Sequence, residues 1–172
     1  MGKIPEKLIN FAVYNDGAEM LGVADATLPS LEYMTDTVGG AGIAGEVDSP
    51  VLGHFKSLTV GIKFRTVTGN VTALAAPKSH HLDLRGSIQV YDSGSGEYTP
   101  TSVKLVVKAV PKKAALGKFE TGKPQDSENE FEVNYLKLWI DGVEKIEIDK
   151  YNYMCVIDGV DYLAAVRANL GK

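Results

Sequence analysis

The stretch from Gly39 to Phe55 reads Gly-Gly-Ala-Gly-Ile-Ala-Gly-Glu-Val-Asp-Ser-Pro-Val-Leu-Gly-His-Phe, with four glycines in its first seven residues. The segments on either side of it, residues 31–38 and 57–67, alternate between apolar and polar side chains as β-strands do. A tight hairpin connects its strands through about two to five residues. A connection of this length is therefore expected to be either functional or disordered.

The apolar side chains of this stretch argue against disorder, because they would gain free energy from burial. We interpret residues 39–55 as an arm that orders against a neighbouring copy of the chain and stays mobile in a free monomer. The alternative is a long hairpin that folds back on its own sheet. The residues expected to make contacts between subunits are Ile43, Glu46, Val47, Asp48, Val51, Leu52 and Phe55.

Length and composition limit the possible classes of protein. At 172 residues the chain is expected to form one domain, residues 1–172. The 22 acidic and 18 basic residues give a net charge of −4, which argues against a general nucleic-acid-binding surface. Neither a signal-peptide apolar region nor a run of about 18 apolar residues is present, so we expect synthesis inside the cell and no stable membrane binding. The single cysteine, Cys155, excludes an internal disulfide and is expected to be buried.

The rest of the chain is dominated by strand patterns. The clearest places Leu58, Val60, Ile62 and Phe64 on one face. Further strands are expected around residues 9–13, 20–28, 82–91, 103–110 and 151–157. Short helices are expected at residues 70–76 and 161–170, the second capped by Asp161 and ended by Gly171. The pattern predicts a mainly β protein, an antiparallel sandwich or barrel with one or two short helices.

A long hairpin is expected over residues 130–149, because Asp141-Gly142 suits a type I′ turn between two strand patterns. A two-residue loop would pair Ile140 with Val143 and Trp139 with Glu144. In that register apolar side chains lie on both faces: Val133, Tyr135, Ile146 and Ile148 on one, and Leu136, Leu138, Ile140 and Val143 on the other. The hairpin is therefore expected to be covered on both sides, by its own core and by a neighbouring subunit.

No motif predicts catalysis. His80 and His81 are adjacent in a strand and so point to opposite faces, which leaves His81 and Asp83 short of a metal site. The lysines Lys104, Lys108, Lys112 and Lys113 are interpreted as protection of a strand edge, and the acidic run Asp126, Glu128, Glu130 and Glu132 as a solvated face. We expect no enzyme activity, cofactor or metal.

Several segments of the chain are distinctive in combination: Ile4-Pro-Glu-Lys-Leu-Ile-Asn-Phe, Gly40-Ala-Gly-Ile-Ala-Gly-Glu-Val-Asp-Ser-Pro, His81-Leu-Asp-Leu-Arg-Gly, Glu147-Ile-Asp-Lys and Val166-Arg-Ala-Asn-Leu-Gly. Together they resemble the phage major tail tube protein family, the inner-tube proteins of contractile-tailed phages and of R-type, tail-like bacteriocins. The resemblance runs from Ile4 to Gly171. One departure is Phe64, where the family is expected to favour tryptophan.

The resemblance implies a β-sandwich whose copies join their sheets around a six-fold ring, with the arm bridging subunits and stacked rings. It implies as partners further copies of the chain, a tail sheath protein, a tape measure protein, and baseplate and tail-terminator proteins. DNA would pass through the channel without specific binding. The particle would be a virion tail or a bacteriocin, made and assembled in the host bacterial cytoplasm.

Three other functions are weighed against this one. The tube protein of a type VI secretion or extracellular contractile injection system is the first alternative. A carbohydrate-binding sandwich is less favoured, because the single tryptophan, Trp139, lies inside a strand pattern. An enzyme comes last, because no nucleophile–base pair is evident.

Overall fold

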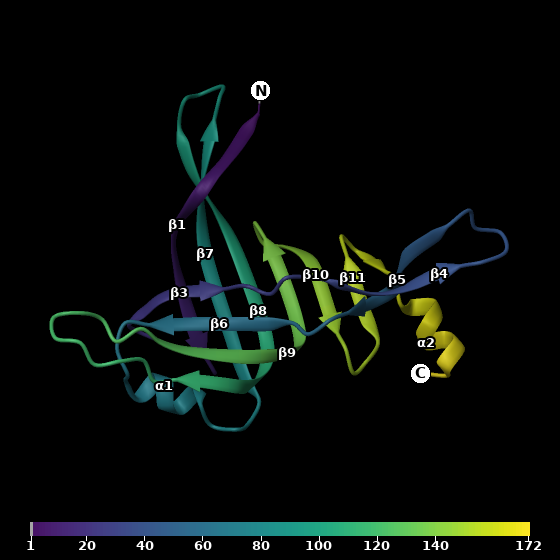
Figure 1. Cartoon of the computed structure of the whole chain (residues 1–172). Coiled ribbons are helices and arrows are strands. Elements are labelled where there is room, and N and C mark those ends of the chain that lie inside the picture. The colour runs from purple at the N-terminus through teal and green to yellow at the C-terminus, as the bar shows by residue number, and fades with distance from the viewer. Residues whose placement is uncertain (1) are drawn as a thin grey trace.

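The computed structural model describes residues 2–172 and shows a mainly antiparallel β protein, as the sequence predicts. Two layers of strands pack against each other, and two projections extend beyond them (Figure 1). The elements are β1 (Lys3–Asn15), β2 (Ala18–Glu19), β3 (Val23–Thr27), β4 (Tyr33–Gly39), β5 (Glu46–Phe55), β6 (Thr59–Phe64), α1 (Gly69–Leu74), β7 (His80–Asp92), β8 (Tyr98–Ala115), β9 (Ser127–Ile140), β10 (Val143–Asp149), β11 (Met154–Ile157), β12 (Val160–Asp161) and α2 (Ala164–Leu170).

The main sheet follows the order β12-β11-β10-β9-β8-β7-β1-β2, and β6 joins it through β9. The change of layer takes place along β9. Its first part, Ser127–Glu132, pairs with β6, whereas Tyr135–Ile140 pairs with β10, and β8 remains the neighbour on the other edge. In Figure 1, β3 and β6 cross in front of the steeper strands β1, β7 and β8.

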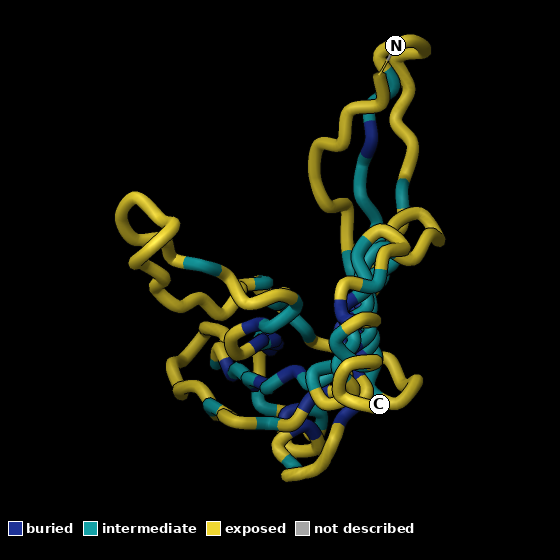
Figure 2. Tube along the Cα trace, turned by 90° about the vertical axis from the view of Figure 1, so that its right-hand side faces the viewer, coloured by how far each residue is buried: buried dark blue, intermediate teal, exposed yellow. Residues whose placement is uncertain are grey.

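The core lies between these two layers. The predicted face of β6 is confirmed, because Leu58, Val60, Ile62 and Phe64 are all almost fully buried. They pack with apolar residues of β7, β8 and β9 and with two residues of α1, Val71 and Leu74. Figure 2 shows that buried residues concentrate between the layers, while much of the projecting chain is exposed.

The long hairpin forms with the predicted turn, since Ile140 faces Val143 and Trp139 faces Glu144. The predicted division of its faces is wrong. A β-bulge between Glu144 and Ile146 shifts the register, so Ile146 faces Leu138 and Ile148 faces Leu136. One extra residue moves every later side chain to the other face of the sheet.

The bulge gathers apolar side chains on the core side, where Leu136 and Ile148 are buried and Leu138 and Ile146 pack against them. Tyr135, Lys137 and Trp139 then share the opposite face with Glu144 and Glu147. The premise that neither face is polar is therefore wrong, and cover by a neighbouring subunit stays a prediction. One face of this hairpin is polar.

Other elements lie close to their expected positions. The strand expected at 103–110 is longer, Tyr98–Ala115, and with β7 and β1 it forms a projection that ends near the N-terminus (Figure 1). The second helix begins at Ala164 rather than Asp161, but Gly171 ends it in the left-handed conformation at a φ of 72°. No helix within residues 2–172 has the length and apolar character needed to cross a membrane.

Phe131 lies where β9 passes from one layer to the other, so loss of its side chain should destabilise the fold. Phe131→Ala empties a fully buried site and should lower the free energy of unfolding by about 3–5 kcal/mol. Phe119→Ala is the matched control: that ring is 94% exposed, so its loss should change stability by no more than about 0.5 kcal/mol. Urea unfolding followed by Trp139 fluorescence measures both. Equal effects of the two changes would contradict the placement of Phe131 at the centre of the core.

Candidate assembly interface

The stretch interpreted as a connection is itself part of a hairpin. Residues Glu46–Phe55 form β5, which pairs with β4 in a separate two-stranded sheet, so the actual connection is only residues 40–45. Glycine is needed in this connection, because Gly40, Gly42 and Gly45 have φ angles of 105°, 91° and 112°. The stretch is thus a hairpin, but it projects away from the main sheet and does not fold back on it, as the alternative required (Figure 1). We call β4, residues 40–45 and β5 the arm.

Six of the seven predicted contact residues are available on the arm. The side chains of Glu46 and Asp48 are exposed, as are those of Ile43, Val47, Val51 and Leu52. Asp48 accepts a hydrogen bond of 3.0 Å from the Thr37 hydroxyl of the facing strand. Phe55 differs, because it is buried in its own subunit with its ring 4.6 Å from that of Tyr33. It anchors the arm, and it does not belong to the arm's free surface.

The root of the arm borders an open apolar hollow of about 480 Å³. Val51 and Leu52 line it from the arm, while Cys155, Ile157 and Tyr162 line it from the C-terminal part of the chain. Nearby, Gly53 approaches the residue before α2 so closely that an added Cβ would lie 2.6 Å from Leu163 Cδ2. The arm root is thus fitted against the C-terminal segment, and part of its apolar surface is left uncovered.

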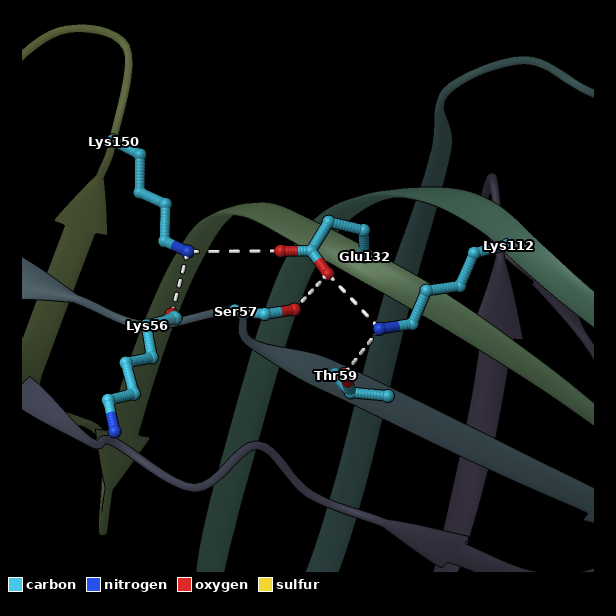
Figure 3. Close-up of polar contacts among 6 residues, drawn as sticks. All are labelled: Lys56, Ser57, Thr59, Lys112, Glu132 and Lys150. Carbon is cyan, nitrogen blue, oxygen red and sulfur yellow. Dashed lines mark hydrogen bonds and ion pairs between the residues drawn. The ribbon is translucent and has the colours of Figure 1, made fainter. Parts of the chain in front are cut away.

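A network of polar contacts around Glu132 fixes the segment that follows the arm (Figure 3). The Glu132 carboxylate accepts a hydrogen bond from the Ser57 hydroxyl and lies 3.2 Å from Lys112 Nζ and 3.8 Å from Lys150 Nζ. Lys112 also donates to Thr59, and Lys150 donates to the Lys56 carbonyl oxygen. The network therefore joins the chain between β5 and β6 to β8, β9 and the end of β10.

Electrostatics favour the ionised form of Glu132. Burial by itself would raise the pKa of this carboxyl, but the hydrogen bonds from Ser57 and Lys112 and the charges of Lys112 and Lys150 outweigh it, so the pKa lies below its usual value. No local sequence pattern predicts this role, because Ser57 and Glu132 are 75 residues apart. The sequence alone places Glu132 in an acidic run interpreted as a solvated face. It places Lys112 among lysines interpreted as protection of a strand edge.

A second ion pair stabilises the C-terminal segment below the hollow. The Arg167 guanidinium of α2 pairs with Asp161, whose carboxylate also accepts the backbone N–H of Leu163. The hydrogen bond from Arg167 lowers the pKa of Asp161. Asp161 thus binds the N–H of Leu163, the N-cap residue, and does not cap the helix as the sequence predicts.

The histidines and the cysteine considered as catalytic or metal-binding candidates lie apart from one another. His80 is buried, with its Nε2 3.0 Å from the Ala76 carbonyl oxygen, while His81 is exposed on the opposite face. Cys155 is buried, and burial followed by the charge of Asp161 raises the pKa of its thiol. Among residues 2–172, no three His, Cys, Asp or Glu side chains are grouped closely enough to hold a metal ion.

Comparison with known proteins decides the family. The family model of phage tail tube protein FII matches residues 5–171 of the chain. The chain belongs to this family. It is a structural subunit of the inner tube of a contractile tail, as the resemblance in its sequence implied.

One relative and two solved structures are also similar to this chain. The tail tube protein of Escherichia phage P2 is 29% identical over 175 residues, which is 98% of this chain and 98% of that protein. The sheath/tube terminator of an extracellular contractile injection system, PVC, in its extended state superimposes with a TM-score of 0.52 at 12% identity. That alignment covers 78% of this chain and 96% of the terminator, and it shows a shared fold. A chain of the PVC sheath-tube complex gives a TM-score of 0.48 at 12% identity over 75% of this chain and 87% of its own length.

The stability of the fold should depend on pH through Glu132, and Glu132→Gln should remove that contribution. Because the folded-state pKa of Glu132 is lowered, its contribution to stability is fully present above the unfolded pKa of about 4.5. That contribution disappears as the pH falls through the folded value. Glu132→Gln should therefore be less stable than the parent at pH 7, and the difference should shrink toward zero at acidic pH. Thermal unfolding across this range measures it.

The exposed Glu97 offers a matched control for the same substitution. Glu97→Gln should follow the parent at every pH. A stability difference between Glu132→Gln and the parent that stays constant from pH 7 to strongly acidic pH would contradict the assignment.

Proposed function

We propose that copies of this chain close into hexameric rings and that these rings stack into the tail tube. The observation that supports it is the pair of open edges at the two ends of the main sheet. In residues 2–172, β1 has β7 on one side and on the other only the two-residue β2, which faces Tyr14 and Asn15. The opposite end of the sheet is formed by β11 and the short β12.

Two different edges at opposite ends of one sheet are the geometry of a head-to-tail contact. Repetition of such a contact by a fixed rotation gives a closed ring. Closure removes the unpaired backbone groups of both edges, which would otherwise promote aggregation. The six-fold number comes from the family resemblance. Aligned around a ring, the main sheets would form the channel wall, with β3, β6 and α1 outside it.

The arm is the proposed contact between neighbouring subunits and stacked rings, through Ile43, Glu46, Val47, Asp48, Val51 and Leu52. Its apolar side chains project into solvent in a single chain, and the hollow at its root is only partly covered. Burial of each such side chain by a neighbour would contribute roughly 1.5–3 kcal/mol. The arm forms its hairpin within the subunit, so docking needs less ordering than a flexible loop would.

The partners beyond the tube itself are also proposals. The sheath, tail-terminator and baseplate proteins would contact the outside and ends of the tube, and a tape measure protein would occupy the channel during assembly. DNA would pass through without specific binding, and the chain itself would have no catalytic role. The subunit would act in a virion tail or tail-like particle assembled in the host bacterial cytoplasm.

A phage or bacteriocin tail is favoured over an extracellular injection system. The full-length relative is a phage tail tube protein, whereas the likeness to the injection-system terminator extends to the fold alone. Electron microscopy of the purified, concentrated protein tests the proposal. Tubes of stacked six-fold rings support it, and a strict monomer at millimolar concentration contradicts it.

Removal of two apolar side chains from the arm should prevent assembly. Val51→Ser with Leu52→Ser takes away anchors that are 40% and 59% exposed in the single chain, so the fold should survive while tubes disappear. Circular dichroism verifies the fold, and light scattering with microscopy measures the tubes. Leu21→Ser is a control, because Leu21 is 70% exposed in the turn before β3, outside the arm. Normal tubes from the double variant would exclude the arm as an essential contact.

The arm's charge should tune assembly in a salt-dependent way. Residues 33–55 contain Asp36, Glu46 and Asp48 but no lysine or arginine. Glu46→Gln with Asp48→Asn should shift the concentration at which tubes form, and the shift should diminish as salt screens the exposed charges over a Debye length of about 8 Å. Sedimentation of tubes at low and high salt measures this. A shift that does not depend on salt would show that the two side chains act by packing or hydrogen bonding.

A further inference from the structure

One side of the main sheet carries both cations and aromatic rings. We call it the polar face: the side of β7–β10 turned away from β3 and β6, on which Arg85, Lys104, Lys137 and Trp139 lie. Leu82, Leu84, Leu105 and Val107 of the same strands point the other way, into the core. Because of the bulge in β10, Ile146 and Ile148 point to the core, and Glu144 and Glu147 lie on the polar face.

Four cations of this face lie over aromatic rings. Arg85 Cζ lies 4.8 Å from the centre of the Tyr14 ring, and Lys108 Nζ lies 5.1 Å from that of Tyr135. Trp139, the chain's single tryptophan, has two cations over its ring, Lys104 Nζ and Lys137 Nζ, each at 5.2 Å. All four contacts lie within the range of cation–π attraction.

A hollow of about 390 Å³ opens on this face, lined in part by Arg85, Lys104 and Trp139. Grooves that bind single-stranded nucleic acid combine the same two elements, cations for the phosphates and aromatic rings on which bases stack. With its cations and rings alone, the polar face would bind a nucleic acid.

Three carboxylates offset these cations at short range. Asp83 lies 2.8 Å from Arg85 and 3.9 Å from Lys104. Glu147 and Glu144 lie 3.0 Å and 3.3 Å from the same ammonium group, Lys137 Nζ. The hydrogen bond with Glu147 raises the pKa of Lys137, so this lysine stays charged and paired.

Stability does not account for this arrangement, because partly exposed ion pairs contribute little to it. The cations stay folded over the rings, and each ring is shielded from a base that would stack on it. Each of three cations also has a carboxylate within 4 Å, well inside the Debye length of about 8 Å, so a phosphate approaching the face meets a nearly neutral surface.

We propose that Asp83, Glu144 and Glu147 keep the polar face from retaining a nucleic acid that moves along it. The purpose of this device rests on the proposed function, in which the main sheet forms the channel wall and the polar face looks into the channel. A conduit needs a wall that does not hold its cargo. In this chain that property comes from local pairing of charges, and not from the overall net charge of −4.

Removing the three negative charges should expose the hidden binding surface. In Asp83→Asn/Glu144→Gln/Glu147→Gln the cations keep their charge and lose their partners. The dilute, monomeric variant should bind single-stranded oligothymidylate at about 50 mM salt at least about tenfold more tightly than the parent, with an affinity that falls steeply as salt rises. Because Trp139 lies on this face, binding should also change its fluorescence.

The matched control makes the same change of charge elsewhere. Glu32→Gln/Glu97→Gln/Glu120→Gln removes three exposed acids away from the polar face and should bind no better than the parent. Adding Lys104→Gln and Lys137→Gln to the first variant should return its binding to the parental level. If the triple variant fails to fold, Glu144→Gln alone, at a side chain that is 42% exposed, should change affinity in the same direction by a smaller factor.

The proposal is overturned if the polar-face variant binds no more tightly than the parent, or if the control variant gains as much affinity. Its failure is separate from that of the proposed function, because binding is measured on the monomer and needs no tube. Tube formation by the parent, followed by microscopy, is the separate readout for assembly. Tubes without a gain in oligonucleotide binding would leave the assembly standing and remove the role of the three carboxylates.

Discussion

The structure depends on the way β9 passes from one layer to the other. This single strand pairs with β6 over its first part and with β10 over its second, so it holds the two layers together. At the junction, successive side chains point in opposite directions. Phe131 fills the core between the layers, and Glu132 faces outward to the chain that leaves the arm. The alternation of a strand thus couples core packing to the position of the arm.

Charged side chains have two different roles in this chain. Around Glu132, lysines and hydroxyls converge on one carboxylate and connect segments that are remote in sequence. On the polar face, Asp83, Glu144 and Glu147 lie within 4 Å of Arg85, Lys104 or Lys137. The first arrangement fixes geometry, whereas the second governs what the surface attracts. Net charge alone describes neither, because both depend on which side chains are neighbours.

The fold leaves much of its apolar and backbone surface incomplete in a single chain. The arm extends its apolar side chains into solvent, and within residues 2–172 the outer edges of β1 and β12 are open over most of their length. A protein that acts alone would normally cover such features. In the proposed assembly the next copy would cover these surfaces, so the incompleteness of the single chain supports that proposal.

The sequence by itself determined the class of fold, the family and many of the local elements. Alternation of apolar residues located β6, and Asp141-Gly142 gave the turn and the first pairs of the long hairpin, because those signals are local. Tertiary structure decided the rest. One bulge after Glu144 reversed the predicted faces, since a shift of a single residue moves all later side chains to the other side. The pairing of Ser57 with Glu132, the burial of Phe55 and the polar face also arise only when distant segments meet, and no local pattern records such a meeting.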